Sequence, residues 1–145
     1  MKQQFSLLCA VHLFLVKGNK ILLLRRFNTG YEDGNFSLIA GHINGGETIQ
    51  AAMIREAREE AGISIDPANL EIVLAMHRRV SDGHERIDYF LRCENWQGDV
   101  KNLEPHKCDL LEWFDIHNLP RNIIPYVAKA IGSYLKGINF DSFGF

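Results

Sequence analysis

Residues 41–63 read GHINGGETIQAAMIREAREEAGI, a glycine-rich segment followed by a run of alanine and glutamate. The second half has the apolar spacing of a helix over residues 49–61. Three glutamates of this helix fall within an arc of roughly 100 degrees at 3.6 residues per turn. They are Glu56, Glu59 and Glu60. The segment therefore predicts a helix that presents three carboxylates together on one face.

The position of these carboxylates distinguishes a solvated surface helix from a helix that binds a cation. A glutamate-rich helix is most often a solvated surface with salt bridges between residues four apart. Here, however, Glu56 and Glu60 border the apolar stripe formed by Ile49, Met53 and Ala57. Like charges beside an apolar face repel each other and are costly to desolvate, so these carboxylates are expected to be protonated or neutralised by a strongly positive partner. Clustered carboxylate oxygens suit hard divalent cations, and magnesium in particular.

The glycines that precede the helix are Gly41, Gly45 and Gly46. Glycine allows backbone conformations that other residues avoid, so main-chain groups can approach a metal or a diphosphate there. The segment also leads to the N-terminal end of a helix, where free amides favour anions. Glycine clusters alone are usually turns. Joined to the glutamates at this spacing, they indicate a phosphate-binding site.

The rest of the chain alternates between apolar runs and turn residues, which predicts an α+β fold. Strands are expected at residues 7–16, 20–26, 36–40, 70–80, 84–93 and 110–114. The helix over 49–61 is expected to have Thr48 as its N-cap and to stop at Gly62. A final helix should open at Pro125 and end at Gly137. Its apolar face is expected to carry Val127, Ala130, Ile131, Tyr134 and Leu135. This order suggests a mixed sheet packed between helices.

Composition narrows the possible partners. A formal charge of -2 gives no general attraction to a nucleic acid polymer or an anionic membrane. No segment approaches the roughly 20 apolar residues that span a bilayer. The cysteines Cys9, Cys93 and Cys108 form neither a disulfide framework nor a CxxC pattern, which fits a reducing cytoplasm. Residues 1–145 are expected to form a single domain.

The segment resembles the Nudix box, a signature of Nudix hydrolases. All of its specified positions match, and they are Gly41, Glu47, Arg55, Glu56, Ala57, Glu59, Glu60, Gly62 and Ile63. More loosely, the whole chain resembles the small MutT-like branch, which includes nucleoside-triphosphate pyrophosphohydrolases. The resemblance implies the Nudix fold, an α/β/α sandwich. Dimers occur widely in the family, so a monomer or a homodimer is expected.

The resemblance also implies roles for single residues. Glu56, Glu59 and Glu60, joined by the main-chain carbonyl of Gly41, would bind Mg²⁺, for which Mn²⁺ is a possible substitute. Arg55 and Glu47 would orient that cluster. Related enzymes take their general base either from the box or from a later loop. Glu59 is therefore one candidate for the base, and Glu104, in the irregular stretch before Trp113, is the other.

Contacts with the substrate are open to several interpretations. Many family members have Pro-Gly-Gly where this chain has Ala40-Gly41-His42, so His42 either touches the substrate or fills the loop. Lys107 could neutralise a phosphate or simply be solvated. Aromatic faces that could hold a base are Tyr31, Phe36 and Trp113, although aromatic residues are also routine in protein cores.

Several functions are compatible with these residues. The first is hydrolysis of a nucleoside triphosphate to a monophosphate and pyrophosphate. The second is hydrolysis of a diphosphate-linked compound such as ADP-ribose, a nucleotide sugar or a dinucleoside polyphosphate. A module that only senses a nucleotide would be expected to lose the metal glutamates, and this chain keeps them. A structural zinc site at His106, Cys108 and His117 matches no usual zinc spacing.

Overall fold

The computed structural model describes residues 3–145 and contains strands, two α-helices and a short 3-10 helix. The elements in chain order are β1 (Leu8–Lys17), β2 (Lys20–Arg26), β3 (Phe36–Ser37), β4 (Ile39–His42), α1 (Ile49–Ala61), the 3-10 helix (Pro67–Asn69), β5 (Glu71–Arg79), β6 (Glu85–Cys93), β7 (Cys108–Asp115), α2 (Pro125–Leu135) and β8 (Phe140–Phe143). The expected helices and most of the expected strands are therefore confirmed, but the strand expected over 36–40 is divided into β3 and β4, and β4 continues to His42. The sequence did not predict β8 or the 3-10 helix.

Strand β1 organises a mixed sheet. It pairs antiparallel with β2 and β4 and parallel with β6, while β6 pairs antiparallel with β5 and β5 pairs parallel with β8. Strand β2 carries β3 and β7 as further antiparallel neighbours. Parallel and antiparallel pairs in one sheet confirm the predicted α+β class. The central position of β1 explains its long apolar run, because both of its faces are covered.

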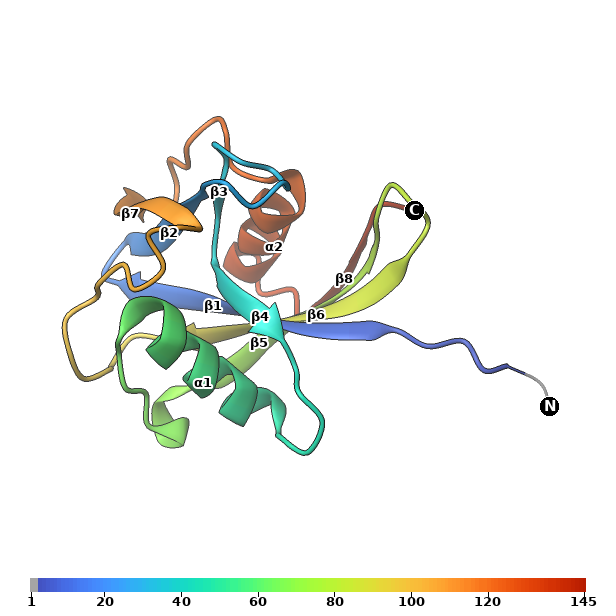
Figure 1. The fold of residues 1–145 in the computed structure, drawn as a ribbon, viewed down its shortest axis with the longest axis horizontal. Helices are drawn as coiled ribbons and strands as arrows, with labels where there is room; N and C mark the ends of the chain where they lie inside the picture. Colours follow the sequence, from blue (N-terminus) through green and yellow to red (C-terminus); the bar gives the residue numbers. More distant parts are fainter. Residues whose placement is uncertain (1–2) are drawn as a thin grey trace.

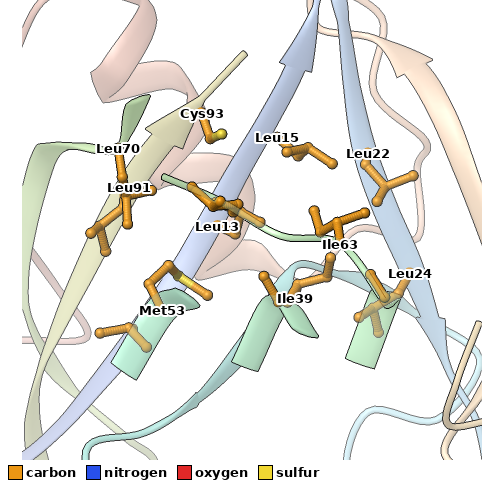
Figure 2. Close-up of a cluster of buried hydrophobic side chains, with 14 of the residues drawn as sticks. Leu13, Leu15, Leu22, Leu24, Ile39, Met53, Ile63, Leu70, Leu91 and Cys93 are labelled. Carbon is orange, nitrogen blue, oxygen red and sulfur yellow. The ribbon is translucent and has the colours of Figure 1, made fainter. Parts of the chain in front are cut away.

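The two helices cover opposite faces of the sheet (Figure 1). Alternate residues of β1 point to opposite faces, so Leu13 and Leu15 pack on the α1 side with Met53. Figure 2 shows this cluster, in which side chains of β1, β2, β6 and α1 meet. Phe14 faces the other way and packs with Val127 and other apolar residues on the α2 side. The predicted sandwich of a sheet between helices is confirmed.

The ends of α1 follow the local signals in the sequence. The Thr48 hydroxyl accepts a hydrogen bond from the Ala51 amide at 3.1 Å. At the other end, Gly62 adopts a left-handed conformation with φ 70°, and its N–H donates to the Arg58 carbonyl. Helix α2 begins at Pro125 and spans to Leu135, and Gly137 terminates it in a left-handed conformation with φ 72°, as expected. The expected apolar role of Leu135 is wrong, because 43% of this residue is exposed at the end of the helix.

None of the helices within residues 3–145 is long and apolar enough to cross a bilayer.

Candidate active site

A cavity of about 600 Å³ opens beside the C-terminal end of β4 and is lined by residues from both helices, several strands and the loops between them. Its carboxylates are Glu56, Glu59, Glu60 and Glu104. Its arginine, lysine and histidine side chains are His12, Arg26, His42, Arg78, Arg86 and Lys107. Both Tyr31 and Tyr126 add aromatic rings. Acidic and basic groups therefore share one cavity, as a site for a metal ion and a polyanion requires.

Glycine is required at position 41 because the backbone of β4 lies against Glu56. A Cβ atom added at Gly41 would come within 2.1 Å of the Glu56 carboxyl carbon and of one of its oxygens. No two such atoms can approach so closely, so any larger residue would displace the carboxylate. The main chain of Gly41 and the Glu56 carboxylate thus lie side by side, with no room for a side chain between them.

Arg55 ties the glycine-rich loop to α1. Its guanidinium donates to both carboxylate oxygens of Glu47, at 2.8 and 3.1 Å, and to Glu56 at 2.8 Å. It also donates to the His42 carbonyl at 3.2 Å. These hydrogen bonds lower the pKa of Glu47 and raise the pKa of Arg55, so both groups remain charged. Arg55 therefore links helix α1 to the glycine-rich loop, through Glu47, and to the end of β4, through the His42 carbonyl.

Glu60 is the most enclosed of the glutamates. Its carboxylate accepts a hydrogen bond from the Ala40 amide at 3.2 Å. Burial raises the pKa of Glu60 well above its ordinary value, and the neighbouring carboxylates of Glu56 and Glu104 raise it further. A group in this position either takes up a proton or is neutralised by a cation. The donor set of hard carboxylate oxygens beside a main-chain cradle fits a divalent cation.

The glutamates share the cavity without forming a finished cluster. Within residues 3–145, no group of three His, Cys, Asp or Glu side chains has an arrangement that could hold a metal ion. The Glu59 carboxylate lies 3.5 Å from the Arg55 guanidinium, and its side chain is 55% exposed. Glu59 would have to turn toward Glu56 and Glu60 to complete a metal site.

The aromatic and basic residues expected to contact substrate fall into two groups. Tyr31, His42 and Lys107 line the cavity. Phe36 does not, since it is buried and its ring packs edge-on against Phe114 in the core. The expectation of a substrate face at Phe36 is therefore corrected, because pairing of β3 with β2 turns this residue inward. Trp113 likewise stacks on Trp96, away from the cavity.

Sequence reasoning missed a buried charged network on the α2 side of the cavity. Asp88 is fully buried and accepts hydrogen bonds from Arg78 at 2.6 Å and from His12 at 3.0 Å. Burial would raise the pKa of Asp88, but the hydrogen bonds and charges of His12 and Arg78 outweigh it and lower the pKa to about 2. The available signal was polar residues at inward positions of apolar strands, and His12 within the first apolar run is one example.

The chain is similar to known proteins in both sequence and fold. The NUDIX domain family model matches residues 7–132. The chain is 32% identical over 130 residues to an ADP-ribose pyrophosphatase from Methanocaldococcus jannaschii, covering 90% of this chain and 74% of that protein. It is 29% identical over 105 residues to an oxidized purine nucleoside triphosphate hydrolase from Danio rerio, covering 68% of this chain and 61% of that protein. The crystal structure of a MutT NUDIX hydrolase from Burkholderia pseudomallei has the same fold, with a TM-score of 0.80 at 21% identity over 88% of this chain and 98% of that one.

Proposed function

Because this chain belongs to the Nudix family, we propose that it hydrolyses a phosphoanhydride bond of a small-molecule nucleotide held against the glutamates of α1. One observation carries the proposal: Glu56, Glu59 and Glu60 line a single cavity, and the backbone of Gly41 lies against Glu56. Carboxylates in this position would repel phosphates by themselves. The cavity therefore suits a phosphate substrate only when a cation is shared between them.

Glu56, Glu59, Glu60 and the Gly41 carbonyl are the groups that would hold the cation, either Mg²⁺ or Mn²⁺. When bound, the cation supplies charge for the phosphate oxygens and lowers the pKa of water. Arg55 contributes indirectly, since its bonds to Glu47 and Glu56 fix the helix against the loop. Arg55 and Glu47 are therefore positioning groups, and removing either should disturb the metal ligands without unfolding the protein.

A carboxylate must also accept the proton of the attacking water. Glu59 is one candidate, because it is exposed and bonded only to Arg55 within the described residues. Glu104 is the other candidate, because it lines the same cavity from the loop before β7. Water adds to one phosphorus, the bridging P–O bond breaks, and the products are two phosphate compounds. No covalent intermediate with the enzyme is needed.

Two substrate classes are consistent with this chemistry. Nucleoside triphosphates, cleaved to a monophosphate and pyrophosphate, are our first candidate, and the arginine and lysine side chains of the cavity support them. Diphosphate-linked compounds are the second candidate, supported by the similarity to an ADP-ribose pyrophosphatase. The two differ in their products.

A substrate panel assayed with Mg²⁺ and with EDTA tests the proposal. Anion-exchange chromatography would detect either pyrophosphate and a monophosphate or two monophosphates. Glu59→Gln should lower kcat by at least about 100-fold without changing the melting temperature. Glu71→Gln, an exposed glutamate of β5, is the matched control and should retain wild-type rates. Equal rates with EDTA and with Mg²⁺, or a fully active Glu59→Gln, would contradict the proposal.

A further inference from the structure

The α2 side of the cavity carries two arginines that are neither metal ligands nor hydrogen-bonded to the glutamates of α1. Arg78 of β5 and Arg86 of β6 are directly opposite each other in the antiparallel register of these strands. Residues opposite each other in such a pair point to the same face, and both arginines line the cavity. Like charges in this arrangement destabilise a sheet, so their placement calls for an explanation.

Arg78 is held rigidly with part of its guanidinium free. It is only 4% exposed, its Nε donates to Asp88 at 2.6 Å, and its guanidinium carbon lies 3.7 Å from the centre of the Tyr126 ring. Its two Nη atoms donate to no atom of residues 3–145, and they are not fully buried. They therefore face the cavity. His12 supports Asp88 from behind, which makes both residues positioning groups for Arg78.

Arg86 carries the charge that the network leaves uncompensated. Asp88 offsets Arg78, but no carboxylate of residues 3–145 lies within 4.0 Å of Arg86. Within residues 3–145, its one hydrogen-bond partner is the His42 Nε2 atom, which accepts from Arg86 at 2.9 Å. Two guanidinium groups with free N–H donors, one of them without a counterion, match the oxygens of a phosphate.

We propose that Arg78 and Arg86 form a subsite for a third phosphate of the substrate, separate from the two phosphates joined by the bond that is cleaved. This inference rests on the proposed function and deepens it by naming the substrate class. The third phosphate has two possible sources. It is either the terminal phosphate of a nucleoside triphosphate or a phosphate ester on the ribose. A diphosphate-linked compound without a third phosphate would leave the subsite unfilled.

Equilibrium binding of non-hydrolysable α,β-methylene analogues in the presence of Mg²⁺ tests the subsite without turnover. Calorimetry would compare the analogue of ATP with that of ADP, and the analogue of ADP-ribose 2′-phosphate with that of ADP-ribose, on wild type and Arg86→Gln. We expect Arg86→Gln to weaken binding of the ligand with the extra phosphate at least fivefold more than binding of its partner, in one of the two pairs. The pair that responds identifies the source of the phosphate. Arg86→Lys, which keeps the charge, should recover part of the loss.

Arg79→Gln is the matched control, because Arg79 is exposed on the opposite face of β5 and should change neither pair. Equal losses for both members of each pair, or no loss at all, would overturn the subsite. If Arg79→Gln shows the same selective loss of affinity as Arg86→Gln, the loss reflects the general charge of the protein, and this result would also overturn the subsite. If no nucleotide is hydrolysed with Mg²⁺ but the selective loss persists, the proposed hydrolysis fails while the phosphate subsite stands.

Discussion

Gly41 determines how closely the backbone of β4 approaches the Glu56 carboxylate. We predict that Gly41→Ala lowers kcat by about 100-fold, because a misplacement of about 1 Å in a catalytic constellation has an effect of this size. The added Cβ would overlap the end of a flexible side chain, which can move aside, so the fold should be retained. Steady-state kinetics with a thermal unfolding control would measure both quantities.

Gly45→Ala is the control for that substitution. A Cβ at Gly45 meets no atom within 4 Å, and its φ is not positive, so this variant should keep wild-type activity. Similar activity for the two alanine variants would show that the close contact between β4 and Glu56 is unimportant for the reaction.

Asp88 should govern stability at acidic pH. Its pKa is about 2 in the folded protein compared with an ordinary 3.8, so its ionised form contributes about 2 kcal/mol, fully present above pH 4. This contribution is lost as the pH falls toward 2. At neutral pH, Asp88→Asn should lower the free energy of unfolding by about 3 kcal/mol, because it leaves Arg78 buried without its partner.

Urea denaturation at several pH values would measure the effect of Asp88→Asn. The gap between wild type and variant should narrow below pH 4, whereas the exposed control Asp99→Asn should show no gap at any pH. A gap that stays constant down to pH 2 would rule out this account of the buried network.

At the scale of elements, α1 depends on its first turn for local stability. Thr48→Ala removes the side-chain acceptor for the Ala51 amide and should lower the free energy of unfolding by about 1 kcal/mol. Chemical denaturation measures this directly, and Ser81→Ala in the exposed turn between β5 and β6 serves as the comparison. A loss of equal size in both variants would argue against a capping role.

The elements that were predictable are those whose signals are local. Helix α1 begins and ends where Thr48 and Gly62 place it, because capping acts within one turn. Strand β8 was missed because its strand conformation comes from parallel pairing with β5, about 65 residues earlier in the chain, which local patterns do not encode. Phe36 was misassigned for a similar reason, since its inward direction depends on the register with β2.

At the scale of the whole molecule, the candidate site could likewise be predicted only where its residues are close in sequence. Its acidic side could be predicted because Glu56, Glu59 and Glu60 all belong to one helix face. Its basic side could not, because Asp88 meets His12 only through the parallel pairing of β1 with β6. Strand register is set by the complete sheet, so residues far apart in sequence become neighbours only once the fold has formed.

The central claim is that the glutamates of α1 together hold a divalent cation. Electron paramagnetic resonance of free Mn²⁺, titrated into wild type and into the Glu56→Gln, Glu60→Gln double variant, measures this without any assumption about the substrate. Wild type and the Glu71→Gln control should bind Mn²⁺ and so lower the signal of the free ion. The double variant should bind Mn²⁺ at least about tenfold more weakly. Equal Mn²⁺ binding by the double variant and wild type would contradict the assignment of these carboxylates as metal ligands.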